Sequence, residues 1–115
     1  MREDEFQRYS DARTYVWALA EGAEDDATMR YVQVCDDLDA ACRDAGIAPA
    51  LTVEGVERAE MYARAHAAVV GLRGADVDPL ALELVIADLD AAWAAESGAD
   101  PADLVDRSPA TEPTA

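Results

Sequence analysis

The chain has 115 residues, with 25 acidic side chains against nine basic ones, and its formal net charge is −16. All nine basic residues are arginine. This charge balance excludes a protein that binds the phosphate backbone of nucleic acids, because such binding needs clustered cations. No apolar run approaches the roughly 20 residues of a membrane span, and residues 1–5 lack the apolar core of a signal peptide.

The apolar content predicts a folded domain with a thin core. Leu, Ile, Val and Phe together supply only 22 residues, a share at which disorder becomes the first expectation for a highly charged chain. Apolar residues nevertheless recur with a helical period, and Ala, the strongest helix former, occurs 26 times. We therefore expect one small helical domain whose stability a partner or self-association would complete.

Four segments have helical periodicity, and each ends near a glycine. The first covers about residues 4–21 and the second about residues 26–45. The third begins at a Thr52 cap and continues to about Arg73; its second half is apolar almost all round, which is typical of a central helix. The fourth begins at Asp78-Pro79, because Asp caps a helix and Pro suits its first position. Its predicted apolar face consists of Leu82, Val85, Ile86, Leu89, Ala92 and Trp93.

No strand or hairpin signal is present, so we predict an all-α fold. Residues 1–98 would form a four-helix bundle, and residues 99–115 an acidic, Pro- and Thr-containing disordered tail. The sequence Asp-Leu-Asp-Ala-Ala occurs at both 37–41 and 88–92, and Ala12-Arg13 recurs as Ala63-Arg64 at the same offset of 51. Two duplicated helical hairpins would produce this match; so would chance in a chain rich in Ala and Asp.

The cysteines and the histidine predict no chemistry. Cys35 and Cys42 lie seven residues apart on one helix, about 10 Å along its axis, which is too far for a disulfide. We expect buried, reduced thiols, as in a cytoplasmic protein. His66 is the only histidine and has no Ser or Cys nucleophile tied to it, so we expect neither catalysis nor metal binding from it.

The carboxylates offer the only candidate for catalysis. Glu57 and Glu60 form an E-x-x-E pair, and the aspartates of residues 36–39 and 88–90 could face it across a bundle. All-α nucleotide pyrophosphatases place an E-x-x-D after such a pair, and this chain lacks the second element. A Mg²⁺-dependent nucleotide hydrolase therefore stays a second alternative, and the prediction is a non-enzyme without metal or cofactor.

The acidic surface is the most distinctive feature. From Asp78 onward, nine carboxylates accompany Arg107 alone, and such a field attracts basic partners while repelling nucleic acid and anionic membranes. We predict a regulatory or interaction protein that binds a basic protein surface. As an alternative, the carboxylates imitate DNA phosphates, as in a phage-type inhibitor of a nucleic-acid-binding host protein. The charge could also serve solubility alone.

The candidate partner-binding residues combine fourth-helix carboxylates with an aromatic residue beside the first helix's apolar stripe, because Trp anchors interfaces well. They are Asp78, Glu83, Asp88, Asp90, Glu96 and Trp17. Trp93 is predicted to lie in the core instead. A homodimer is a further expectation, because a second copy would enlarge the thin core.

Overall fold

Helices make up all the regular secondary structure of the part of the chain that the structure describes. A computed structural model describes residues 1–98, apart from the side chain of Asp25. Its helices are α1 (Glu3–Glu21), α2 (Asp25–Ala41), the short 3₁₀ helix η1 (Arg43–Ala45), α3 (Arg58–Val70) and α4 (Pro79–Ser97). The predicted all-α fold is confirmed, and the predicted tail lies outside the described residues. Within residues 1–98, every helix is too short or too polar to span a membrane.

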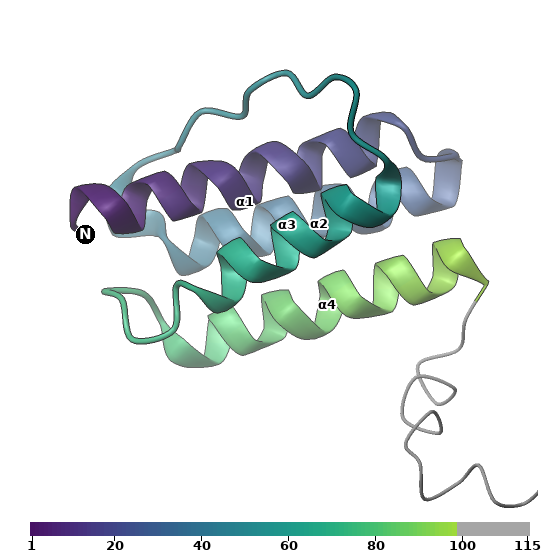
Figure 1. Ribbon diagram of the computed structural model, residues 1–115. Coiled ribbons are helices and arrows are strands. Elements are labelled where there is room, and N and C mark those ends of the chain that lie inside the picture. Colours follow the sequence, from purple (N-terminus) through teal and green to yellow (C-terminus); the bar gives the residue numbers. More distant parts are fainter. Residues whose placement is uncertain (99–115) are drawn as a thin grey trace, which may run out of the picture.

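The four long helices form two layers. α1 and α4 run in one direction and α2 and α3 in the other, and an extended linker, residues 46–57, passes along α1 between α2 and α3 (Figure 1). The most extensive helix contacts join α1 to α3 and α2 to α4. We call these pairs the α1/α3 layer and the α2/α4 layer. Consequently α1 lies diagonally from α4, and α2 diagonally from α3.

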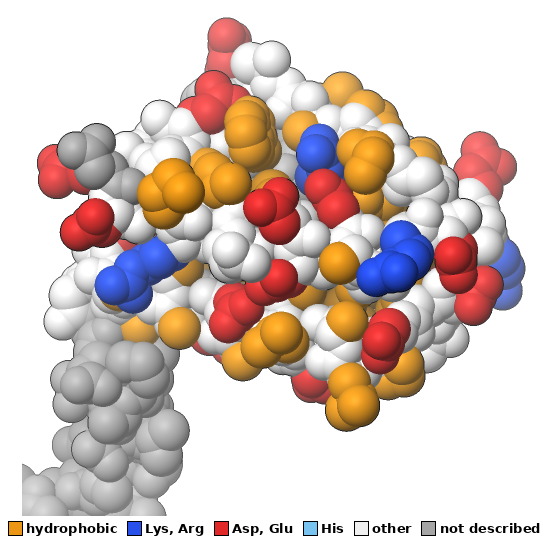
Figure 2. Space-filling view, turned by 180° about the vertical axis from the view of Figure 1, so that it is seen from behind, with side chains coloured by type: hydrophobic (Ala, Val, Ile, Leu, Met, Phe, Trp, Pro, Cys, Tyr) orange, Lys and Arg blue, Asp and Glu red, His pale blue; other side chains and the backbone are white. Residues whose placement is uncertain are grey.

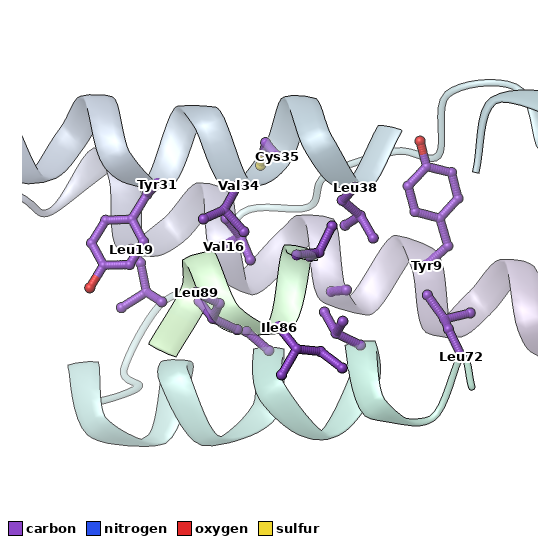
Figure 3. Packing of buried hydrophobic residues seen from close by; sticks show 14 of the residues in the cluster. Tyr9, Val16, Leu19, Tyr31, Val34, Cys35, Leu38, Leu72, Ile86 and Leu89 are labelled. Carbon is purple, nitrogen blue, oxygen red and sulfur yellow. The ribbon is translucent and has the colours of Figure 1, made fainter. Parts of the chain in front are cut away.

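The core lies between the two layers, where side chains from all four helices converge (Figure 3). Five of the six residues predicted for the apolar face of α4 are buried. The sixth, Trp93, is half-buried and stacks on Tyr62 with ring centroids 5.1 Å apart. Cys35 and Cys42 are buried free thiols, as predicted. Burial raises the pKa of Cys35 to about 12 and that of Cys42 to about 11, so both stay protonated at neutral pH.

Two predicted helix boundaries are wrong. α2 ends at Ala41, four residues early, because η1 and then Gly46, with φ of +80°, turn the chain away. α3 begins at Arg58 rather than at a cap on Thr52, and it ends at Val70. Of the four glycines that were expected to end helices, only Gly98 occupies the cap position in a left-handed conformation.

The linker stays extended because two buried hydroxyl groups of α1 bind its backbone. Ser10 Oγ donates a hydrogen bond to the carbonyl oxygen of Pro49 at 2.7 Å. The Leu51 N–H donates to Thr14 Oγ1 at 3.0 Å. These bonds satisfy polar groups that would otherwise be buried without partners, which is costly. They join positions 37 to 39 residues apart, so local sequence gives no sign of them.

The third helix is not central, contrary to the prediction. α3 packs mainly against α1 and buries Ala65 and Val69, while Ala63 and Ala67 are exposed. An alanine-rich face can remain in water at little cost because each methyl group presents a small apolar area. An uncharged, alanine-rich face on α3 therefore did not indicate that the helix is buried on all sides.

The two helical hairpins repeat one arrangement of side chains. In each, a tyrosine and a basic residue one turn later contact an aspartate on the following helix. These residues are Tyr9, Arg13 and Asp39 in the first hairpin, and Tyr62, His66 and Asp90 in the second. The tyrosine hydroxyl donates to the carboxylate at 2.6 Å in both. The basic nitrogen lies 3.0 Å from the carboxylate oxygen in the first hairpin and 3.5 Å in the second.

The repeat has two offsets. Buried residues 34, 38 and 41 of α2 match buried residues 85, 89 and 92 of α4 at the predicted offset of 51. α1 and α3 instead match at an offset of 53, which aligns Tyr9 with Tyr62 and buried Val16 with buried Val69. The predicted match of Ala12-Arg13 with Ala63-Arg64 is therefore displaced by two residues. The two hairpins therefore resemble each other in their buried positions and in this contact between a tyrosine, a basic residue and an aspartate.

Candidate partner-binding surface on helices α2 and α4

Charge is divided unevenly between the layers. The sequences of α2 and α4 contain nine carboxylates and one arginine, whereas those of α1 and α3 contain six carboxylates and four arginines. Viewed from the side of α2, carboxylates alternate with hydrophobic patches, and arginine side chains are scattered (Figure 2). The α2/α4 layer is therefore where a basic partner would find the strongest field.

Three of the five carboxylates predicted for partner binding in and near α4 accept hydrogen bonds from other groups of the protein at the helix surface. Asp78 caps α4, since its Oδ1 accepts hydrogen bonds from the backbone N–H groups of residues 80 and 81 at 3.0 and 3.3 Å. Glu83 accepts two hydrogen bonds from the Arg73 guanidinium, both at 2.8 Å, and this pairing lowers its pKa. Asp90 is held by Tyr62, as described above. Their charge is thus partly compensated within the protein.

Glu96, the fourth predicted carboxylate, belongs to a cluster that joins all four helices. Arg58, at the start of α3, donates from Nε to Glu96 Oε2 at 2.6 Å and from Nη2 to the carbonyl oxygen of Leu19 in α1 at 3.0 Å. Tyr31 of α2 lies beside this pair. Hydrogen bonding from Arg58 lowers the pKa of Glu96. The geometry makes Glu96 a structural residue more than a free contact.

Asp88 is the predicted carboxylate whose charge is left uncompensated. It lies near Asp37 of α2, across the seam between the two helices, so that the two side chains influence each other. Burial, followed by the effects of the Asp37 side chain, raises the pKa of Asp88. Gln33 Nε2 donates to Asp37 at 3.0 Å, but no arginine among residues 1–98 forms an ion pair with either aspartate.

A shallow hollow opens beside this pair. Its volume is about 370 Å³, and it is lined by Met29, Arg30, Gln33, Asp88, Ala91 and Ala92. Met29 is 66% exposed. The hollow therefore places one carboxylate, Asp88, and one guanidinium, Arg30, next to the apolar side chains of Met29, Ala91 and Ala92.

Trp17 does not belong to this surface. It is 40% exposed on α1, the helix that lies diagonally from α4. A partner that covers Asp88 would therefore contact a different face of the bundle. The six predicted residues are not one contiguous site.

The E-x-x-E pair considered for a metal-dependent hydrolase lies at the start of α3. Glu57 is exposed at the cap position of α3, and Glu60 pairs with Arg64 at 3.3 Å. Both lie on or beside the helix diagonal to α2, so they do not face the aspartates of residues 36–39. Within residues 1–98, no three His, Cys, Asp or Glu side chains gather closely enough to hold a metal ion.

Sequence reasoning missed the apolar part of the surface. Leu80 and Leu84 are 83% and 53% exposed, and they share a stripe with exposed Ala87 and Ala91. A signal was present, because the spacing i, i+4, i+7 and i+11 is itself helical. This spacing indicates a second apolar face on α4, in addition to the face that packs in the core.

Comparison with known proteins identifies no relative. No protein-family model matches the chain. No curated protein and no solved structure matches it either. The functional argument therefore depends on the surface chemistry described above.

Proposed function

We propose that the protein is a non-catalytic binding module that recognises a basic surface of a partner protein through its α2/α4 layer. The excess of carboxylates over arginines on α2 and α4, within which Asp88 lies near Asp37, is the observation that carries this proposal. Two carboxylates so close together repel each other, and a guanidinium or ammonium group between them would replace repulsion with charge-assisted hydrogen bonds. Partner binding would therefore relieve an unfavourable interaction in the free protein.

The surroundings of the pair favour a protein partner. The adjoining hollow is partly apolar, with Met29 and two alanines in its lining beside the polar side chains of Arg30, Gln33 and Asp88. Protein interfaces combine apolar contact with polar recognition in this way. The alternative, in which the carboxylates act as a DNA mimic, requires the bound protein to release the module when duplex DNA is added.

The test compares two variants with the same net charge. In the first, Asp36→Asn, Asp37→Asn and Asp88→Asn neutralise the α2/α4 layer. In the matched control, Glu3→Gln, Asp11→Asn and Glu21→Gln neutralise three carboxylates of α1. Each immobilised protein is exposed to a lysate of cells that express the chain, and bound proteins are eluted with increasing salt.

Basic proteins should bind to the wild type and to the α1 variant. They should not bind to the α2/α4 variant, because only this variant lacks the Asp37–Asp88 pair. Release at moderate salt is expected for a contact between exposed charges. Equal capture by both variants, or none by wild type, would contradict the proposal. Displacement of the captured protein by duplex DNA would favour the DNA-mimic alternative.

A further inference from the structure

α4 presents an apolar stripe to the outside of the bundle. At about 100° per residue, Leu80, Leu84, Ala87 and Ala91 fall within an arc of about 60°. All four are exposed. This arc is opposite the one that carries buried Val85 and Leu89. α4 is therefore apolar on two opposite faces, and the bundle covers only one of them.

Carboxylates border the outer stripe on both sides. Glu83 lies on the side of α3, where its partner Arg73 is, and Asp88 lies on the side of α2, facing Asp37. α4 contains no basic residue. Glu83 is already paired with Arg73, so the unpaired acidic edge is the one on the side of α2, and its complement is an apolar stripe with basic side chains along that edge.

We propose that the partner element recognised by this protein is a basic amphipathic helix, which lies along α4 with its apolar side on Leu80 and Leu84. This inference rests on the proposed function, since it names the partner element that the acidic layer binds. Arginine or lysine side chains beside the helix's apolar stripe would reach Asp88 and Asp37 on the edge toward α2, whereas Glu83 on the other edge keeps Arg73 as its partner. Helix-in-groove docking of this type uses anchors at i, i+3, i+4 and i+7.

A second copy of the chain fits the stripe poorly. Pairing α4 with another α4 would bring Glu83 and Asp88 close to the same carboxylates of the other copy. No arginine of α4 could compensate that repulsion. The net charge of −16 also opposes association of two copies. Charge complementarity therefore selects a basic helix over self-association.

The experiment uses two fluorescein-labelled synthetic peptides of identical composition, rich in leucine and arginine. One arranges its leucines as a helical stripe flanked by arginines, and the other has them scrambled. Fluorescence anisotropy measures the affinity of the full chain for each. We expect the stripe peptide to bind at least about tenfold more tightly, because only this isomer brings its leucines onto Leu80 and Leu84 together.

Variants assign the effect to the stripe. Leu80→Ser with Leu84→Ser should remove the preference between the peptides. Ile47→Ser with Leu51→Ser should leave it unchanged, because these residues are 65% and 60% exposed but lie on the linker. Circular dichroism checks that both double variants retain the wild-type helix content.

The outcomes separate the two proposals. If both peptides bind equally and the Asp37→Asn/Asp88→Asn variant weakens both, the acidic site stands and helix docking is refuted. If neither peptide binds, helix docking is refuted, and capture from lysate by the α2/α4 and α1 variants decides whether the acidic layer binds a basic partner. A preference that survives Leu80→Ser/Leu84→Ser would refute the placement on α4. Wild-type dimers in sedimentation that dissociate in this variant would assign the stripe to a second copy.

Discussion

The two layers of the bundle differ in how their charges are balanced. Arginines of the α1/α3 layer reach across to the α2/α4 layer, where Arg13 binds Asp39 and Arg58 binds Glu96. These contacts neutralise carboxylates near the core. Among the outer carboxylates of the α2/α4 layer, Glu83 pairs with Arg73 of the loop between α3 and α4, whereas Asp88 forms no ion pair within the described residues. The helices of the α2/α4 layer thus hold more of the negative charge than those of the α1/α3 layer.

The largest predicted effects test whether the layers share one core. Leu19 of α1 and Leu89 of α4 are both fully buried, so Leu19→Ala and Leu89→Ala should each lower the free energy of unfolding by about 3 kcal/mol. Urea unfolding followed by circular dichroism measures both. Leu84→Ala, on the outer face, should cost less than about 0.5 kcal/mol. A small effect at Leu19 or Leu89 would show that the layers do not form a common core.

The next effect concerns the cluster that joins the layers. Arg58→Ala should destabilise the protein by about 2 kcal/mol, because it removes hydrogen bonds to a carboxylate and a carbonyl group. Arg64→Ala, in an exposed pair with Glu60, should cost less than about 1 kcal/mol. Because Arg58 lowers the pKa of Glu96, the cost of Arg58→Ala should shrink as pH falls through that pKa. Equal costs for the two arginine variants would refute the role of the cluster.

A smaller effect tests the equivalence of the two hairpins. Tyr9→Phe and Tyr62→Phe each remove one hydrogen bond to an aspartate, and each should cost about 1 kcal/mol. Tyr9→Phe should lower the stability more than Tyr62→Phe, since Tyr9 is fully buried while Tyr62 is half-buried. The same urea titrations measure both variants. If only one tyrosine contributes, the two arrangements resemble each other in shape but not in energy.

The smallest effect has the opposite sign. Asp88→Asn should stabilise the free protein by about 0.5 kcal/mol at neutral pH, because it removes a charge facing Asp37. The folded-state pKa of Asp88 is raised, so its ionised form disfavours folding above the unfolded-state pKa. The gain should vanish at acidic pH, where Asp88 is protonated in both states. Asp36→Asn serves as the control, because Asp36 is exposed on α2. An Asp88→Asn variant that is less stable than this control would contradict the repulsion between Asp88 and Asp37.

Periodic and capping signals were enough to predict most of the fold. Asp78-Pro79 begins α4 as predicted because its cap is local, with bonds only two and three residues along the chain. The start of α3 was missed because Ser10 and Thr14 hold the linker from another helix. A helix cap formed by neighbouring residues can be predicted from the sequence. A hydrogen bond from a distant helix that shifts a helix boundary cannot.

The same distinction applies to the candidate site. Counting carboxylates identified α4 but could not separate Asp88 from Glu83 or Glu96, because their arginine partners lie 10 and 38 residues away. Asp37 was considered for a metal cluster and as part of the repeated segment, but not for partner binding, since its position near Asp88 depends on how α2 packs against α4. The exposed stripe of Leu80 and Leu84 was readable from spacing alone, but it was obscured by the stronger core face of the same helix.

The most direct test of the account maps where a basic helix binds. Backbone amide shifts of the ¹⁵N-labelled chain are followed while the leucine-striped arginine peptide is added. Saturable changes should cluster at Met29, Gln33, Leu84 and Asp88, and they should weaken strongly in the Asp37→Asn/Asp88→Asn variant. Changes concentrated on the α1/α3 layer, or spread evenly over every acidic surface, would contradict the assignment of binding to α2 and α4.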